Sequence, residues 1–121
     1  MPKKILIIED EKPLARALEL KFTHEGFETA LMNNGEGLEE VLREDQYSLI
    51  LTDLVMPRVD GFEVLEVVQG KGIPVIVLTN LSQEEDEQSA RALGVKDFFI
   101  KSSTPLSQVI DHVKKMLNVS S

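Results

Sequence analysis

The sequence contains no cysteine among its 121 residues. Disulfide bonds, cysteine-ligated zinc sites and thiol nucleophiles are therefore excluded, and this agrees with a reducing cytoplasm. The chain also lacks any apolar run near the ~20 residues that a membrane-spanning helix requires. Near the N-terminus the run ILII is too short for the apolar region of a secretory signal. We therefore expect a cytoplasmic protein with one packed core, since 42% of the residues are hydrophobic.

Basic residues are also scarce, with 13 Lys and Arg against 21 Asp and Glu, a formal net charge of -8. Nucleic acids and anionic membranes are bound through clustered basic side chains, so we expect this chain to contact neither directly. The acidic surplus instead permits cation binding and basic partners. Which acids take part in chemistry depends on where they fall in the fold.

Short apolar runs alternate with stretches of helical periodicity along the whole chain. Five runs are typical of buried strands: residues 4–8, 28–32, 48–52, 74–78 and 97–100. The apolar residues between them recur at helical spacing, as in Leu14, Leu18 and Phe22. This pattern predicts an α/β fold with five strand–helix units, a doubly wound parallel sheet and helices on both faces. With the switch point between strands one and three, the flavodoxin-like strand order 2-1-3-4-5 follows.

The fourth predicted helix differs from the others in how little apolar surface it offers. Ser82 and Glu85 have the spacing of a capping box, and the acids of residues 84–87 suit a helix N-terminus. Only Ala90 and Leu93 are available for burial in this helix. We therefore expect it to be the most loosely held of the five.

Polar side chains stand where four of the predicted strands end. These are Glu9, Asp10 and Glu11 after the first, Asp53 after the third, Thr79 after the fourth and Lys101 after the fifth. Each alone has an ordinary explanation, because strand ends are solvated and Asp often caps the next helix. In a parallel sheet, however, they converge on one rim. Crowded carboxylates that stay ionised normally hold a cation, and oxygen ligands without His or Cys favour magnesium.

Carboxylates, a divalent metal, a hydroxyl and an ammonium together suit phosphoryl transfer. Asp and Glu can be phosphoryl-accepting nucleophiles, while the metal, Lys101 and Thr79 would stabilise charge on the transferred group. Asp53 is the best candidate nucleophile, because it stands alone at the end of a central strand and faces the acid cluster.

With these residues in order, the chain resembles the receiver domain of bacterial two-component response regulators, over about residues 4–118, as a stand-alone domain like the chemotaxis regulators. The resemblance rests on Glu9-Asp10, on D-x-x-M-P-x-x-D-G from Asp53 to Gly61, and on Thr79 and Lys101 after their strands. It implies that Asp53 accepts a phosphoryl group from a sensor histidine kinase or a phosphotransfer protein.

The resemblance also implies a metal site and a switch. Asp10, Asp53 and the backbone carbonyl of Val55 would ligate Mg2+ (or Mn2+), with Glu9 acting through water. Lys101 would contact the phosphoryl group, and Thr79 would move to bond one of its oxygens. Phe98 occupies the switch aromatic position and would turn inward, so that the fourth helix, fifth strand and fifth helix change their surface. That surface would bind an unknown downstream protein, or a second copy in a phosphorylation-dependent dimer.

Several positions depart from the family's pattern. Ser102 follows Lys101 where many receivers have a proline in a cis bond, and we predict a trans Lys101–Ser102 bond, because cis costs about 3–4 kcal/mol before a non-proline residue. Asn80 replaces the small residue usual after the Thr and would narrow access to the site. Val55 and Leu81 lie at positions that tune hydrolysis. Because both are apolar, we hypothesise a comparatively long-lived phosphorylated state.

Two other functions remain open at this point. A protein-interaction module independent of phosphorylation would keep the fold without the chemistry, although the complete residue set argues against it. A phosphohydrolase of similar fold would need an acid or base two residues after the nucleophile, where Val55 stands. We therefore expect a phosphoacceptor that promotes its own phosphorylation and dephosphorylation, not an enzyme with external turnover. Predicted elements extend to about Asn118, so we expect one receiver domain over residues 1–121 without an output domain.

Overall fold

The computed structural model describes residues 2–56 and 60–118. Its elements alternate along the chain as predicted. They are β1 (Lys4–Ile8), α1 (Lys12–His24), β2 (Glu28–Met32), α2 (Leu38–Glu44), β3 (Leu49–Thr52), α3 (Gly61–Val68), β4 (Val75–Thr79), α4 (Glu84–Ala92), β5 (Asp97–Ile100), the short 3-10 helix η1 (Lys101–Ser103) and α5 (Leu106–Met116). The strands form one sheet in the order β2-β1-β3-β4-β5, and every neighbouring pair is parallel. Both the α/β class and the strand order are confirmed.

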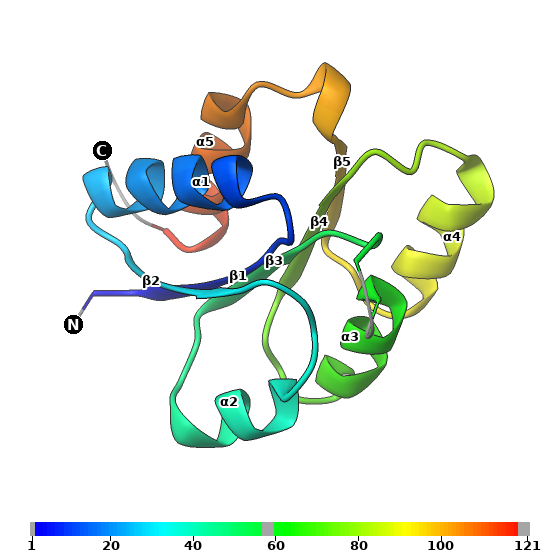
Figure 1. Cartoon of the computed structure of the whole chain (residues 1–121), viewed down its shortest axis with the longest axis horizontal. Coiled ribbons are helices and arrows are strands. Elements are labelled where there is room, and N and C mark those ends of the chain that lie inside the picture. Colours follow the sequence, from blue (N-terminus) through cyan, green and yellow to red (C-terminus); the bar gives the residue numbers. More distant parts are fainter. Residues whose placement is uncertain (1, 57–59, 119–121) are drawn as a thin grey trace.

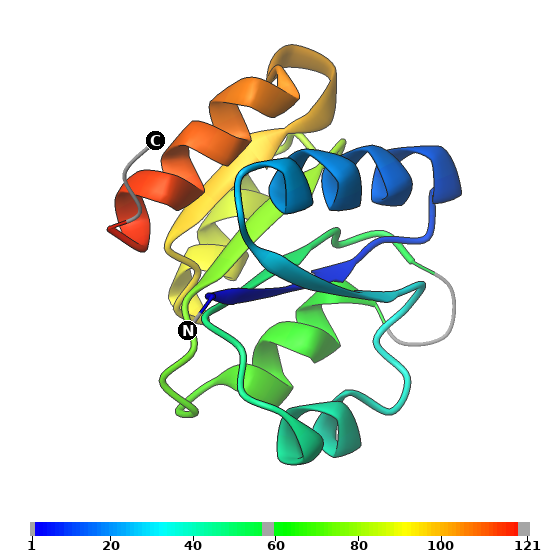
Figure 2. The same ribbon diagram turned by 90° about the vertical axis from the view of Figure 1, so that its left-hand side faces the viewer.

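Helices cover both faces of the sheet, with α1 and α5 on one side and α2, α3 and α4 on the other (Figures 1 and 2). The alternation of side chains along each strand produces this arrangement. Ile5 and Ile7 of β1 belong to the core cluster under α1 and α5. Leu6 and Ile8 belong to the cluster under the other three helices. A strand segment buried on both faces must therefore be apolar, as residues Ile5 to Ile8 of β1 are.

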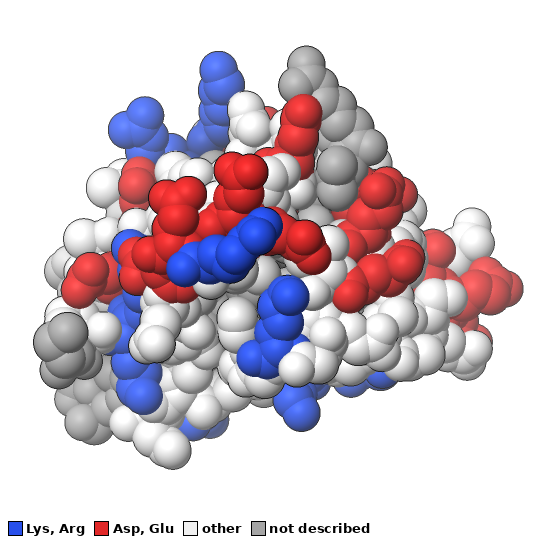
Figure 3. Space-filling view, turned by 90° about the horizontal axis from the view of Figure 1, so that it is seen from below, with Lys and Arg blue, Asp and Glu red and all other residues white. Residues whose placement is uncertain are grey.

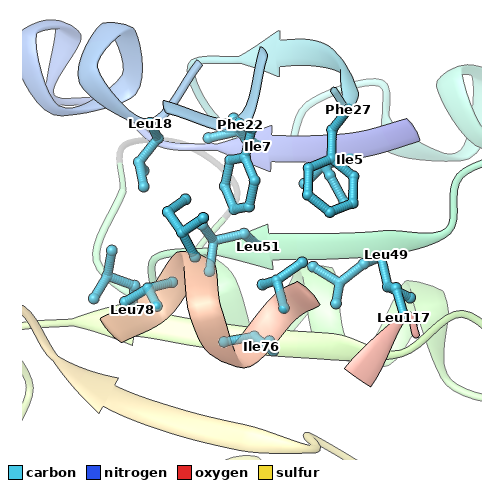
Figure 4. Packing of buried hydrophobic residues seen from close by; sticks show 13 residues of the cluster. Ile5, Ile7, Leu18, Phe22, Phe27, Leu49, Leu51, Ile76, Leu78 and Leu117 are labelled. Carbon is cyan, nitrogen blue, oxygen red and sulfur yellow. The ribbon is translucent and has the colours of Figure 1, made fainter. Parts of the chain in front are cut away.

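The core under α1 and α5 is the layer drawn in Figure 4. Phe22 of α1 and Phe27 lie edge to face, with ring centroids 5.6 Å apart, beside the strand residues of this cluster. Val109 and Val113 of α5 are fully buried in the same layer. The two layers fix the sheet, and with it the positions of the strand ends.

Helix α4 starts one residue later than the predicted capping box requires. The helix begins at Glu84, its N-cap is Gln83, and no side chain caps it, so the capping box at Ser82 is wrong. The acids still occupy the first turn, where the helix dipole favours negative charge. Ala90 is its single buried residue, which confirms that α4 has little apolar contact with the sheet.

The surface over α2 and α3 carries part of the acidic surplus (Figure 3). Helix α2 presents Glu39, Glu40 and Glu44 against Arg43, and α3 has Glu63 and Glu66 without a basic residue. No helix in the described part of the chain is long and apolar enough to cross a membrane.

Candidate functional site

The carboxyl ends of β1 and β3 bring two buried carboxylates side by side. The last pair in the register of these strands is Ile8 with Thr52, so the next residues, Glu9 and Asp53, are neighbours at the rim. The two residues are 4% and 5% exposed. Together with Asp10 they each offer an oxygen, and these oxygens all lie within 4.8 Å of one another. The donor set is all oxygen, which fits a hard divalent cation such as Mg2+.

Asp53 is held by backbone and side-chain donors at once. Its Oδ1 accepts hydrogen bonds from the N–H groups of Leu54 (2.6 Å) and Val55 (3.2 Å). Its Oδ2 accepts one from the Lys101 ammonium at 2.6 Å. Two N–H donors and one cation therefore hold the carboxylate in a fixed orientation.

Lys101 lies directly after β5 and reaches across the rim to the acids of β1 and β3. Its Nζ lies 3.0 Å from Glu9 Oε1 and also forms an ion pair with Glu11. Burial disfavours the ammonium, but the hydrogen bonds to Asp53, Glu11 and Glu9 outweigh this, so the pKa of Lys101 is raised above its ordinary value. Lys101 is therefore a permanent cation at the centre of the acid cluster.

Burial and hydrogen bonding shift the pKa of Glu9 in opposite directions. Desolvation raises the pKa of Glu9 to about 7, although the backbone N–H of Glu11 and the ammonium of Lys101 favour the ionised form. At neutral pH the fold therefore holds a carboxylate that it stabilises poorly. A bound cation would supply the missing compensation.

This predicts that Glu9→Gln stabilises the protein in EDTA at pH 8, by about 1–2 kcal/mol, because the amide needs no ionisation in the buried site. The raised pKa means that wild-type Glu9 keeps its proton in the fold after the unfolded chain has lost it. Wild-type stability thus falls as pH rises towards about 7, and the advantage of Gln is absent in acid and greatest above pH 7. Urea unfolding of wild type and Glu9→Gln at pH 5 and pH 8 measures this difference in the free energy of unfolding. A variant no more stable than Glu39→Gln at pH 8 would contradict the prediction.

Thr79 ends β4 and is fully buried. Its Oγ1 accepts a hydrogen bond from the Leu81 N–H at 3.3 Å, within its own loop. An open cavity of about 380 Å³ lies at the rim beside it. The cavity is lined by Asp10, Glu11, Asp53, Val55, Asn80, Leu81 and Lys101. Six of the predicted site residues therefore line one hollow, while Glu9 and Thr79 are buried at the ends of their strands. Phe98 is half-buried on β5 and packs against the cluster under α2, α3 and α4.

Two of the departures from the expected pattern, Asn80 and Ser102, are hydrogen-bonded to each other. Asn80 Oδ1 accepts a hydrogen bond from the Ser102 N–H at 3.2 Å, which links the loop after β4 to the turn after β5. A proline after Lys101 would lack this N–H. The described residues contain no cis peptide bond, which confirms the trans Lys101–Ser102 bond.

The start of α3 packs against the backbone at Asp53 and helps to hold it in place. Asp60 caps α3, its Oδ1 accepting a hydrogen bond from the Glu63 N–H at 3.0 Å. Gly61 then packs directly against the backbone of residues 53 and 54. Pro57, the proline of the D-x-x-M-P-x-x-D-G motif, lies outside the described residues. The sequence placed Glu11 at the rim with the other acids, but it did not predict the contact of Glu11 with Lys101.

Comparison with known proteins agrees with this geometry. The family described as response regulator receiver domain matches residues 5–114. The chain is 34% identical over 116 residues to the response regulator ArlR of Staphylococcus saprophyticus, a match that covers 94% of this chain and 52% of ArlR. The chain thus spans about half the length of the curated relatives it matches.

Solved structures show the same fold. The phosphorylated cyanobacterial phytochrome response regulator RcpA has a TM-score of 0.86 at 25% identity, covering 100% of this chain and 97% of RcpA. A two-component response regulator from Clostridium difficile has a TM-score of 0.89 at 23% identity, covering 96% of each chain. At that lower identity the likeness speaks for the fold alone.

Proposed function

This chain belongs to the response regulator receiver domain family of two-component signalling, and we propose that it is a switch phosphorylated on Asp53. The donor would be the phosphohistidine of a sensor histidine kinase or a phosphotransfer protein. The observation that carries the proposal is the buried Asp53 carboxylate, with one oxygen on two backbone N–H groups and the other on Lys101. This is a preorganised nucleophile beside a cation that can hold the incoming group.

In the transfer, a carboxylate oxygen of Asp53 forms a bond to phosphorus while the P–N bond of the phosphohistidine breaks. The imidazole leaves with the electron pair of that bond and takes up a proton. Lys101, which already contacts Asp53, pairs with a phosphoryl oxygen and so compensates the charge on that oxygen. The Thr79 hydroxyl, at the end of the adjacent strand, would donate to another phosphoryl oxygen.

The residues that would hold Mg2+ (or Mn2+) are Asp10, Asp53 and the Val55 carbonyl, with Glu9 acting through water. The closely spaced carboxylate oxygens of the three acids support this set. A bound cation supplies charge neutralisation for the phosphoryl group.

The switched surface would be α4, β5 and α5. Moving a two-state equilibrium from 1:99 to 99:1 requires about 5.5 kcal/mol of differential binding free energy. Charge-assisted hydrogen bonds from the phosphoryl group to Lys101 and Thr79 can supply several kcal/mol of this amount. Helix α4 suits such a role because it buries one residue only and so resists displacement weakly. Phe98 lies on β5 itself, opposite Val77 and two residues before the partner of Thr79 in the register of β4 and β5. A downstream protein, or a second copy of the chain, would recognise the change in the cytoplasm.

The experiment that tests this function is labelling with a small-molecule phosphodonor such as acetyl phosphate. We expect one phosphoryl group per chain, dependent on Mg2+ and absent from Asp53→Asn, with Asp45→Asn as a control that removes an exposed acid. Failure to label would instead support an interaction module that works without phosphorylation. Many turnovers of an external phosphoester would support a phosphohydrolase.

The apolar residues beside Asp53 lead to a prediction about the lifetime of the phosphorylated state. Val55 is 56% exposed and lines the cavity together with Leu81. Neither can orient an attacking water by a side-chain hydrogen bond. We expect Val55→Asn combined with Leu81→Asn to shorten the half-life of phospho-Asp53 severalfold, measured by phosphate release. The matched control is Leu20→Asn, which changes an exposed leucine on α1. A half-life equal to that of the control would rule this explanation out.

A further inference from the structure

Glu11 stands at the N-cap position of α1 but does not cap that helix with its side chain. Its carboxylate turns instead to the rim and pairs with the Lys101 ammonium. The Glu11 side chain is 57% exposed, whereas the Lys101 side chain is 10% exposed. Glu11 also lines the cavity that contains Asp53.

Lys101 has three N–H donors, and three carboxylates use them in this structure. An arriving phosphoryl oxygen must therefore displace one of the carboxylates from Lys101. Two of them are fixed by backbone donors. Glu9 Oε2 accepts the Glu11 N–H at 3.0 Å, and Asp53 Oδ1 accepts two further N–H groups. The side chain of Glu11 is the exposed one, so it is the partner that can leave at least cost.

From this contact pattern, and resting on the proposed function, we infer that Glu11 is a positioning residue that occupies Lys101 in the resting state. The phosphoryl group displaces it, and Glu11 thereby lowers the affinity of the site for phosphoryl groups. Like charge adds to the effect, since an anion in the cavity would face the Glu11 carboxylate. Glu11 does not touch the reacting atoms; it acts through Lys101.

The test uses beryllofluoride as the phosphoryl mimic, with saturating Mg2+ so that a change in metal affinity does not alter the result. Binding to wild type, Glu11→Gln and Glu39→Gln is measured by titration calorimetry. We expect Glu11→Gln to bind about 2- to 5-fold more tightly, the range of an exposed ion pair. Glu39→Gln removes the same charge from an exposed position of α2 that does not line the cavity, and should bind as wild type does. Glu11→Asp keeps the charge but is one methylene shorter, and should tighten binding in part.

A second measurement follows the Lys101 ammonium itself by 15N NMR. In the resting protein Glu11→Gln should shift its resonance relative to wild type. With beryllofluoride bound the two resonances should coincide, because Glu11 has then left Lys101 in the wild type too. A merely structural role for Glu11 would not make them converge.

The outcomes separate this inference from the proposed function. If wild type binds beryllofluoride but Glu11→Gln binds equally or more weakly, the role of Glu11 is wrong and the receiver function stands. Equal tightening by Glu39→Gln would show a general charge effect and overturn it as well. If wild type does not bind beryllofluoride at all, the proposed function fails and this inference fails with it. Should Glu11→Gln not fold, binding to Glu11→Asp decides, because unchanged affinity there contradicts the displacement.

Discussion

Replacing Lys101 by methionine should lower the free energy of unfolding in EDTA at pH 8 by about 3 kcal/mol. The substitution keeps the length and apolar stem of the side chain but removes the cation that pairs with Glu9 and Asp53. Both carboxylates are almost completely buried, and removal of one partner of a buried ion pair leaves an uncompensated charge. The residual repulsion between the two acids adds to this cost.

The loss should decrease as the pH falls. Without Lys101, the pKa of Glu9 rises still further above its value in the unfolded chain, because a hydrogen bond that favours the ionised form is lost. Such a group binds a proton in the folded state that the unfolded state does not, so the variant regains stability as pH falls through the raised folded pKa. Addition of Mg2+ at pH 8 should restore part of the loss by the same compensation.

Lys4→Met is the matched control for this experiment. Lys4 pairs with Asp45, but the two side chains are 26% and 46% exposed, and exposed ion pairs contribute about 0–1 kcal/mol. The ammonium also lies 5.5 Å from the centre of the Tyr47 ring, a contact worth about 0.5–1 kcal/mol at an exposed site. Urea unfolding of both variants measures the contrast. Equal losses for the two would mean that the rim acids do not depend on Lys101.

Much of the fold was predictable because the strands are buried on both faces. In β1 the four residues from Ile5 to Ile8 are all apolar and buried. This continuous apolar run distinguishes the strand from the amphipathic helices that follow. Parallel strands then place every C-terminal strand end on one rim. The proximity of Glu9, Asp53 and Lys101 could therefore be predicted before their contacts were known. The strand boundaries moved by one residue, with Leu49 and Val75 as the observed starts.

The parts that were not predictable depend on side-chain reach between loops. Nothing in the spacing of Glu11 indicates that it turns to Lys101 rather than capping α1. The Asn80–Ser102 hydrogen bond joins residues 22 positions apart through one amide oxygen, and neither residue alone indicates the other. Ser82 has the right spacing for a cap, but helix α4 starts one residue later than that cap would require. Local patterns suggest which groups can bond, while the tertiary approach of two loops selects which do.

Gly61, at the start of α3, packs against the backbone of Asp53, the proposed phosphoacceptor. A Cβ on Gly61 would lie 2.3 Å from the Asp53 carbonyl oxygen and 2.5 Å from the Leu54 Cα. Both are backbone atoms, so no side-chain rotation relieves the clash. We expect Gly61→Ala to lower the free energy of unfolding by about 3 kcal/mol, at the upper end of overpacking effects.

The sign of the change in the free energy of unfolding distinguishes a steric clash from an effect of helix propensity. Alanine is favoured over glycine in a helix by about 1 kcal/mol, so a helix start with open space would gain stability from the same substitution. Gly70→Ala is the control, because a Cβ there has no atom within 4 Å and costs only the left-handed backbone strain of roughly 1–2 kcal/mol.

The same clash links the stability of the chain to its site. Gly61 can accommodate a methyl group only if the backbone at Asp53 moves, and that backbone orients the carboxylate through the N–H groups of Leu54 and Val55. Gly61→Ala should therefore bind beryllofluoride more weakly under conditions in which it is still folded, whereas Gly70→Ala should bind as wild type does. Normal affinity in a destabilised Gly61→Ala protein would show that α3, and not the Asp53 backbone, yields to the clash. The requirement for glycine would then be one of helix packing alone.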